Sequence, residues 1–278
     1  MIPEEPPAAQ VQEVPPVKSI PINHDGTLFK DNEGKDMNEI IRSLQERKSM
    51  RVFEDRPISP EDKKLILSCA MEAPTPGNQQ MYTILDITDP ALKAQLAESC
   101  DHQPFIASAP MVCIFCADYQ KWYDVFTVGG ANPRQSGAGD FILAVEDAAI
   151  AAQNAVTAAQ SLGIGSCYIG DIMEQCETHR RLLQLPEYVF PALMLVFGYP
   201  TPQQINRPKP TRCRLEDIVQ GNHYVRRNGE QLKKMFDKET VSQSFEEWSQ
   251  AFCKRKYNSD FSREMTRSVE EYLKSYQK

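Results

Sequence analysis

The 278-residue sequence has no long apolar segment of the kind that crosses a membrane. Its longest useful apolar run, Ala109 to Ala117, is about half of the ~18–20 residues that a transmembrane helix needs. The chain begins at Met1 with prolines and acids, without the basic start and apolar core of a secretory signal peptide. We therefore expect a cytoplasmic protein with no membrane partner.

Cysteine is also scarce, with eight residues in the whole chain, which is too few for a disulfide scaffold of this length. Cys113 and Cys116 form one C-x-x-C inside the apolar stretch MVCIFCAD. A zinc or redox site needs a second ligand pair or a strand-to-helix turn, and neither is visible. We interpret the pair as buried strand cysteines.

Basic residues are outnumbered, since 31 Lys and Arg face 38 Asp and Glu, giving a formal charge of −7. Without a long basic run, this balance argues against nucleic acid as a partner. The four histidines fit no metal-binding spacing, and the dinucleotide, P-loop and hydrolase-elbow motifs are absent. An enzyme without an obvious acid, base, nucleophile or metal often takes its chemistry from an organic cofactor.

The chain divides by composition into an arm and a domain. Residues 1–36 are rich in proline and low in apolar periodicity, which predicts a flexible arm. The domain is expected at 37–278, and its polar, charged stretch 220–278 is typical of a helical extension.

Apolar periodicity and helix-start signals predict the elements of this domain. Asp36 with Glu39 fits a capping box, and Ser59 with Pro60 marks a second helix start. The remaining helices are expected at 89–99, 141–162 (rich in Ala) and 178–185, and the strands at 82–88, 111–117, 165–169 and 193–198. Strands alternating with helices indicate an α/β or α+β fold.

One short segment, ERKSMRVF at 46–53, concentrates positive charge. It contains Arg47, Lys48, Ser49 and Arg51, and guanidinium and hydroxyl groups suit the oxygens of a phosphate. The alternative is an ordinary solvated helix end, where basic residues are common.

The order of segments along the chain resembles the nitroreductase family. R-[RK]-S-x-R-x-F is followed by P-I-[ST], a Pro/Asn loop (APTPGNQQMYTI), HQPFIASAPMVCIFCAD, an Ala-rich helix ending in GIGSCYIGD, the strand LMLVFGYP and a K-P-x-R segment. The resemblance runs from about residue 38 to the C-terminus and is closest to the oxygen-insensitive, NADPH-dependent, flavin reductase P-like branch.

The resemblance implies a three-layer α-β-α fold of the α+β class, with a mainly antiparallel sheet and an intertwined homodimer. It implies FMN as cofactor, NADPH or NADH as reductant, and a small-molecule electron acceptor such as a nitroaromatic, a quinone or free flavin. The implied enzyme is an NAD(P)H-dependent flavin oxidoreductase working by ping-pong hydride transfer through flavin N5, with no catalytic side chain and no metal.

The same resemblance places the cofactor-binding residues. Arg47, Lys48, Ser49 and Arg51 would form the phosphate side, together with Lys209 and Arg212 from a later loop, with Arg214 as an alternative to Arg212. The amides Asn78, Gln80 and Gln103 would meet the flavin, although each also has an ordinary structural explanation in a turn or cap. Tyr168, Ile169, Gly170 and Asp171 would lie along the ring, with the backbone of Gly170 or Asp171 near N5. Tyr168 could equally be an ordinary core residue.

Two departures from the family pattern affect the expected chemistry. Asp171 stands where close relatives tend to have glycine, and a carboxylate there would oppose a negatively charged reduced flavin. Glu246 and Glu247 precede Trp248 where the branch has basic residues, so the preference between NADPH and NADH stays open, with Lys254–Lys256 nearby.

Alternatives to the leading function remain at this point. The first is a dedicated flavin-dependent reductase, a dehalogenase or an ene-type enzyme, and the second is a non-enzymatic FMN-binding protein. Residues 127–140, preceded by Lys121–Tyr123, form a candidate lid or an ordinary surface loop.

Overall fold

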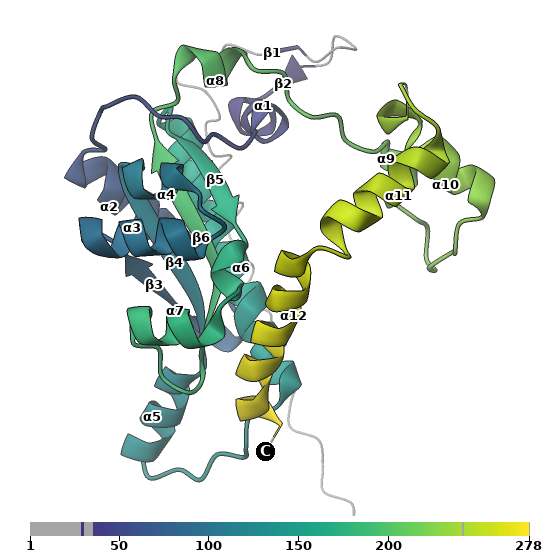
Figure 1. The fold of residues 1–278 in the computed structure, drawn as a ribbon. Helices are drawn as coiled ribbons and strands as arrows, with labels where there is room; N and C mark the ends of the chain where they lie inside the picture. Colours follow the sequence, from purple (N-terminus) through teal and green to yellow (C-terminus); the bar gives the residue numbers. More distant parts are fainter. Residues whose placement is uncertain (1–28, 31–35, 241, 278) are drawn as a thin grey trace, which may run out of the picture. The chain divides into compact units, whose positions relative to one another are not determined.

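The computed structural model describes residues 29–30, 36–240 and 242–277 (Figure 1). The chain divides into two units, 1–45 and 46–278. In the first unit, β1 (Phe29–Lys30) pairs with β2 (Asp36–Met37), and α1 (Glu39–Glu46) begins at the end of this unit. Most of the predicted flexible arm lies outside the described residues.

The second unit is built on a four-stranded antiparallel sheet with the order β3-β4-β6-β5. The strands are β3 (Tyr82–Asp86), β4 (Met111–Asp118), β5 (Gly165–Ile169) and β6 (Val189–Gly198). Pro191 of β6 lies opposite Cys116, where the register shifts, as expected for a residue that lacks an N–H for the ladder. The antiparallel sheet confirms the predicted α+β class.

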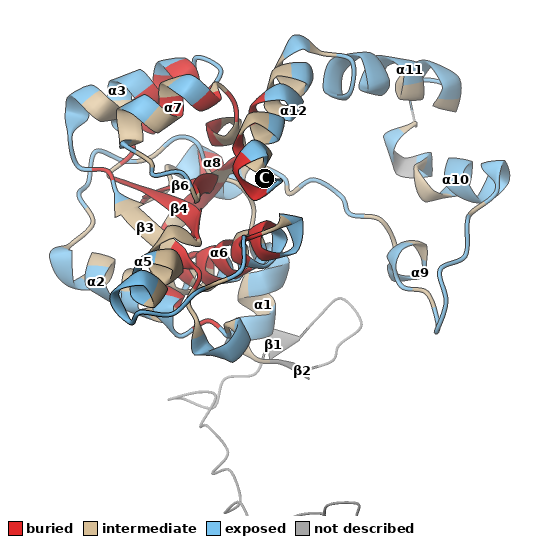
Figure 2. Ribbon diagram, turned by 90° about the horizontal axis from the view of Figure 1, so that it is seen from below, coloured by how far each residue is buried: buried red, intermediate tan, exposed pale blue. Residues whose placement is uncertain are grey.

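Helices cover both faces of this sheet and make three layers (Figure 2). Core side chains of α2 (Pro60–Met71) and α6 (Ala138–Ser161) pack on one face, and those of α3 (Pro90–Ser99) and α4 (Pro104–Ser108) pack on the other. Successive β4 residues alternate between the two cores, as strand geometry requires.

Cys113 and Cys116 confirm the prediction of buried strand cysteines. They lie on opposite faces of β4 and are fully buried, and burial raises the pKa of both thiols to about 12. All eight cysteines of the chain are free thiols.

Of the two helix-start signals named above, one is confirmed and one is wrong. Ser59 Oγ accepts a hydrogen bond from the Asp62 N–H at 3.0 Å, with Pro60 as the first residue of α2. The predicted cap at Asp36 is wrong, because Asp36 lies in β2 and Asn38 Oδ1 accepts the Ile41 N–H at 2.9 Å. Asn and Asp cap equally well, so the sequence alone did not separate the two positions.

Helix α6 is the central helix of the core. Its buried face is largely alanine, which lets the helix approach β3, β4, β5 and β6 closely. By length and composition alone α6 could cross a membrane, but it packs against α2 and the sheet as a core helix. Gly163 ends it with φ of +72°, a conformation that glycine adopts without strain.

Shorter elements complete the second unit. They are α5 (Gln120–Val128), α7 (Cys176–Leu183), α8 (Pro202–Asn206), α9 (Leu215–Ile218), α10 (Gly229–Met235), α11 (Phe245–Lys256) and α12 (Asp260–Leu273), with 3-10 turns at Pro76–Asn78, Asp171–Met173, Asp237–Glu239 and Lys274–Tyr276.

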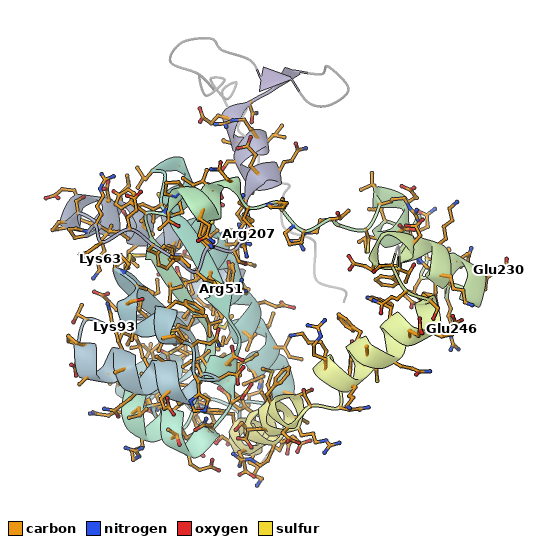
Figure 3. The ribbon with its side chains drawn as sticks, turned by 45° about the horizontal axis from the view of Figure 1, so that its top comes forward. Arg51, Lys63, Lys93, Arg207, Glu230 and Glu246 are labelled. Atoms are coloured by element: carbon orange, nitrogen blue, oxygen red, sulfur yellow. The ribbon has the colours of Figure 1, made fainter. Side chains whose placement is uncertain are left out.

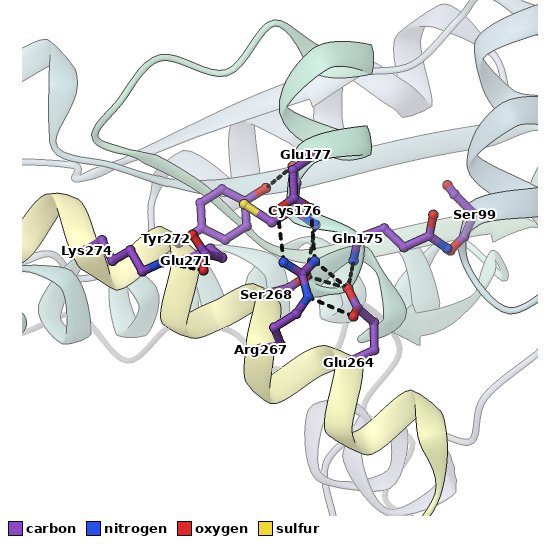
Figure 4. Close-up of polar contacts among 10 residues, drawn as sticks. All are labelled: Ser99, Gln175, Cys176, Glu177, Glu264, Arg267, Ser268, Glu271, Tyr272 and Lys274. Carbon is purple, nitrogen blue, oxygen red and sulfur yellow. Dashed lines mark hydrogen bonds and ion pairs between the residues drawn. The ribbon is translucent and has the colours of Figure 1, made fainter.

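Helix α12 is fastened to α7 by an ionic cluster (Figure 4). Arg267 contacts both carboxylate oxygens of Glu177 at 2.9 Å and also pairs with Glu264. Glu264 in turn accepts the backbone N–H of Gln175, and its pKa is lowered to about 2, chiefly by Arg267. Tyr272 of α12 is buried in the core that α6 and the sheet share, so this helix is part of the sheet-based core rather than a detached tail.

Candidate functional site

The basic segment 47–53 lies along the edge and end of the sheet. Ser49 forms a parallel bridge with Ser166 of β5, and the Met50 N–H donates to the Ser166 carbonyl at 2.9 Å. Phe53 bridges to Pro200 just beyond β6. The segment is therefore held by backbone pairing, not as a free helix end.

Two glycines make room for this segment. A Cβ on Gly165 would lie 2.7 Å from Met50 Cγ, and one on Gly198 would lie 2.6 Å from Phe53 Cγ. Both distances are shorter than real Cβ contacts, so only glycine lets the segment approach the strand ends.

The segment after β6 returns to the same place. The buried Gln204 Oε1 accepts the Arg51 N–H at 3.2 Å, and Arg207 Nη2 donates to the Ser49 carbonyl at 2.5 Å. Lys48 Nζ donates to the Ile205 carbonyl at 2.6 Å and also to that of Arg207. Lys48 thus ties α8 to the segment and has an anchoring role.

Three guanidinium groups gather around Cys167 of β5: those of Arg47, Arg51 and Arg207. We call these three arginines the basic corner; Figure 3 labels Arg51 and Arg207. All three oppose the burial that raises the pKa of the neighbouring Cys167 thiol. Among the described residues, none of the three has a carboxylate within ion-pair distance, and Arg47 Nε, Arg47 Nη2 and Arg207 Nε are buried without partners. Buried charged donors of this kind normally have an anionic partner.

The later loop extends the basic corner. The pKa of Lys209 is lowered, first by desolvation and then by repulsion from Arg212 and Arg47. Arg214, the alternative to Arg212, pairs instead with Asp217 at 2.9 Å and Asp237 at 3.0 Å. The geometry therefore favours Arg212 as the residue that adds charge to the corner.

Strand β5 leads from the basic corner to the second part of the site. Tyr168 packs below Arg47, whose guanidinium carbon is 5.4 Å from the ring centroid, and burial raises the pKa of this tyrosine to about 12. The Ile169 side chain is buried in the opposite core. A Cβ on Gly170 would meet only Met173 Cε, at 3.7 Å, so the space over this backbone is open within the chain.

Gln103 and Asp171 meet at the far end of β5. Gln103 follows α3 and starts α4, and Asp171 starts the turn after Gly170. Gln103 Nε2 donates to Asp171 Oδ2 at 2.9 Å and to the Cys100 carbonyl at 2.8 Å. Two predicted site residues that are 68 positions apart in sequence are thus brought into direct contact.

Glu174 lies beside this contact. It is 5% exposed, and its Oε1 is buried without a hydrogen-bond partner among the described residues. Desolvation, and then the charges of Asp171, Asp101 and Glu264, raise its pKa to about 7. We call Asp171, Glu174, Asp101 and Glu264 the acidic cluster.

The predicted amides Asn78 and Gln80 lie elsewhere. Their loop precedes β3, where Tyr82 pairs with Ala117 at the end of β4 opposite to the end beside Ser166. The length of β4 separates the two ends by about 20 Å. Buried Asp147 of α6 holds this loop by accepting Thr75 Oγ1 at 2.8 Å and the Met81 N–H at 2.6 Å.

The candidate lid is fastened to the core at its start. Lys121 Nζ donates to the Tyr82 carbonyl at 2.7 Å, Trp122 Nε1 to the Gln79 carbonyl at 3.0 Å, and the rings of Tyr123 and Tyr188 are 4.5 Å apart. These three residues belong to α5 and act as anchors.

The acids before Trp248 also have structural partners. Glu246 pairs with Lys233 at 2.6 Å, and Glu247 caps α11 through Ser244. These contacts offset part of the negative charge that would repel a nucleotide phosphate.

Sequence reasoning missed Arg207 and Gln204. Arg207 stands two positions before Lys209 in a segment interrupted by prolines, and alternate residues of an extended chain lie on one face. That spacing was the available signal for Arg207. Gln204 had none, because its role depends on the return of α8 to the basic segment.

Comparisons with known proteins agree with this geometry. The model of the nitroreductase family matches residues 44–199. The chain is 29% identical over 233 residues to a Bacillus subtilis FMN reductase [NAD(P)H], covering 78% of this chain and 90% of the relative. It is 33% identical over 189 residues to an oxygen-insensitive NADPH nitroreductase of Salmonella typhimurium, covering 68% and 75%.

Solved structures give the same result. The structure of B. megaterium NfrA1 superposes with a TM-score of 0.75 at 27% identity, covering 84% of this chain and 98% of that one. The protein is therefore an oxidoreductase with an α+β fold, and its basic corner lies at the edge of the sheet. It belongs to the nitroreductase family.

Proposed function

We propose that this protein is an FMN-dependent NAD(P)H oxidoreductase that reduces small electron-poor acceptors. The observation that carries the proposal is the basic corner, where buried guanidinium nitrogens of Arg47 and Arg207 have no anionic partner among the described residues. The relatives are an FMN reductase and an NADPH nitroreductase, which supports the same assignment.

The site fits FMN by charge and by length. Arg47, Ser49 and Arg51 would hold the phosphate, with Arg207, Lys209 and Arg212 adding charge from the later loop. Ser166 of β5 and Gly170, the residue after β5, lie four residues apart, a span of roughly 13 Å, which suits a phosphate at one end and a ring system at the other. The open space over Gly170 supports this placement, because a ring needs close approach to the backbone there.

Bound FMN would supply two-electron chemistry between NAD(P)H and an electron-poor acceptor such as a nitroaromatic, a quinone or free flavin. The chain itself binds and orients the cofactor. The backbone at Gly170 and Asp171 would offer N–H groups to the ring, and the Gln103 amide would offer a further polar contact. No residue of the site needs to act as a nucleophile, and the described cysteines nearby are held as buried thiols.

We also propose a homodimer, since one chain carries its predicted site residues at two ends of the sheet. The Asn78–Gln80 loop precedes β3 and Gly170 follows β5, and these strands form opposite edges of the sheet, about 14 Å apart, so a second copy would have to bring the loop to the flavin ring. The exposed Ile142, Leu143 and Ile150 of α6 (55%, 42% and 42%) are the matching apolar surface. Sedimentation should give a dimer, and Ile142→Asp should give monomers, whereas Val128→Asp, at an exposed position of α5, should leave the dimer intact.

The reducing nucleotide and location are the finer parts of the proposal. Both NADPH and NADH are proposed as reductants, since Glu246 and Glu247 are engaged within the chain and Lys254–Lys256 are exposed. Eight free thiols suit a soluble protein of the reducing cytoplasm.

The test is a visible spectrum of the purified protein, followed by anaerobic addition of NADPH or NADH in the same cuvette. We expect flavin absorbance that bleaches with at least one nucleotide and returns with a quinone. A protein that stays colourless after incubation with FMN would reject the proposal. Bound flavin that neither nucleotide reduces would point to the non-enzymatic alternative.

A further inference from the structure

The contact between Gln103 and Asp171 fixes the direction of an amide. Gln103 Nε2 is within hydrogen-bond distance of Asp171 Oδ2 (2.9 Å) and the Cys100 carbonyl oxygen (2.8 Å). A carbonyl and an ionised carboxylate can only accept, so the amide NH₂ must face both of them. Both N–H donors of the side chain are therefore used within the protein.

The other end of the amide is left as an acceptor. Gln103 Oε1 accepts no hydrogen bond from any described residue, and it is not among the buried unpartnered atoms. It points away from Asp171 because the amide group is planar. A ligand that meets this atom must present an N–H or O–H donor.

The Asp171 carboxylate beside Gln103 also has no counter-ion within the described part of the chain. No basic side chain of the described residues lies within ion-pair distance of it. Of the titratable groups around it, Glu174 and Asp101 are acids, Cys100 is a buried thiol, and Glu264 is already paired with Arg267. A charge without a counter-ion in a partly buried place acts over several ångströms because screening is weak there.

We propose that Asp171 is a positioning residue for the cofactor, which it controls in two ways through this contact. It locks Gln103 so that Oε1 accepts a hydrogen bond from FMN, and its charge disfavours the reduced, negatively charged flavin relative to the oxidised one. This inference rests on the proposed function, because it takes FMN as the ligand between the basic corner and Gly170.

Two substitutions separate the hydrogen bond from the charge. Asp171→Asn keeps an oxygen that accepts from Gln103 but removes the charge. Asp171→Ala removes both. Asp101→Asn is the matched control, since Asp101 belongs to the same acidic cluster without contacting Gln103, and asparagine tolerates its φ of +60°.

The readouts are the dissociation constant of oxidised FMN, measured by flavin fluorescence, and the midpoint potential of the bound flavin. For Asp171→Asn we expect affinity for oxidised FMN within about threefold of wild type. The ratio of its affinity for reduced FMN to its affinity for oxidised FMN should rise about tenfold. This corresponds to a midpoint potential that is higher by about 30 mV for a two-electron couple. Asp101→Asn should change the potential much less.

The role through Gln103 is tested by a double-mutant cycle. Asp171→Ala should weaken oxidised FMN binding about fivefold when Gln103 is present. It should have no further effect on that affinity in a Gln103→Ala background, because the lost interaction is then already absent. Thermal melts of each variant check that it is folded, and if Asp171→Ala does not fold, Asp171→Gly, which also removes the contact with Gln103, takes its place in the same cycle.

If the midpoint potential of the bound flavin is unchanged or lower in Asp171→Asn, the proposed effect of the Asp171 charge is wrong. An equal loss of affinity on Asp171→Ala with and without Gln103 would overturn the positioning role. These failures differ from failure of the proposed function, in which the wild-type protein binds no FMN or is not reduced by NADPH or NADH.

Discussion

The two ends of β5 differ in the sign and permanence of their charge. At the Ser166 end, Arg47, Arg51 and Arg207 gather without carboxylate partners among the described residues. At the Gly170 end, acids gather, and one of them has a pKa raised to about 7. Guanidinium groups stay charged at every working pH, whereas a carboxyl with this pKa changes its charge near neutrality.

This difference separates binding from tuning along one strand. The guanidinium groups of the basic corner keep their charge at every working pH, so they add no pH dependence of their own to the binding of a phosphate. The acidic cluster acts on whatever lies over Gly170, and its charge depends on pH. In the proposed function, β5 therefore joins the end that would anchor the cofactor to the end that would adjust its chemistry.

The largest expected effect comes from removing the basic corner. Arg47→Ala with Arg51→Ala should raise the dissociation constant of FMN about 100-fold or more, because each charge-assisted hydrogen bond is worth about 1.5–3 kcal/mol. Titration of the apoprotein with FMN measures this change. Arg181→Ala, at an exposed position of α7, is the control and should bind normally. A loss of less than about threefold in the double variant would mean that the anchor lies elsewhere.

A substitution that shifts the basic segment without removing charge should weaken FMN binding less. The Cβ of Gly198→Ala would lie 2.6 Å from Phe53 Cγ, so the segment 49–53 must shift. We expect a loss of about 1–3 kcal/mol in the free energy of unfolding and weaker FMN binding. Urea unfolding and FMN titration are the measurements. Gly221→Ala meets no atom within 4 Å and is the matched control; similar losses in both variants would contradict this account of Gly198.

At the acidic end, the prediction concerns pH. Since the folded pKa of Glu174 is raised to about 7, the folded state binds this proton more tightly than the unfolded chain does. The resulting stability is present below about pH 4.3, the usual pKa of Glu, and is lost as the pH rises to about 7. Glu174→Gln should therefore be more stable than wild type at pH 8, by at most about 3 kcal/mol, and should lose less stability between pH 4 and pH 8.

Urea unfolding at both pH values measures this difference. Glu270→Gln, an exposed glutamate of α12, serves as control and should keep the wild-type pH dependence. If Glu174→Gln keeps it as well, Glu174 does not titrate as the structure indicates.

The smallest effect separates two neighbouring arginines of the later loop. Arg212→Ala should weaken FMN binding about three- to fivefold, because an exposed, screened charge contributes little. Arg214→Ala should leave FMN affinity unchanged, since its charge is already paired with Asp217 and Asp237. The reverse order of effects, measured by the same titration, would reassign the corner to Arg214.

Local signals in the sequence predicted much of the fold. Ser59 with Pro60 marked the start of α2, the alanine stripe marked α6, and apolar runs marked the strands. The short helices α4 and α8 were not predicted, because five residues carry too little periodicity. The order of the strands and the register shift at Pro191 depend on pairing between distant segments, which local patterns do not encode.

The candidate site was predictable in its residue types and less so in its contacts. The ERKSMRVF cluster indicated a phosphate site by chemistry and spacing. The anchoring of Lys48, the engagement of Arg214 and the contact of Gln103 with Asp171 each join residues through tertiary structure. The position of the Asn78–Gln80 loop at the other end of the sheet likewise follows from strand pairing alone.

In the proposed function, the basic corner recognises the phosphate of the flavin. Its most direct test compares the dissociation constants of FMN and riboflavin, which differ by that phosphate, in the wild type and in the Arg47→Ala, Arg51→Ala variant. We predict that the wild type prefers FMN by about 100-fold or more and that the variant loses most of this preference. Equal affinity of the wild-type protein for FMN and riboflavin would contradict the account.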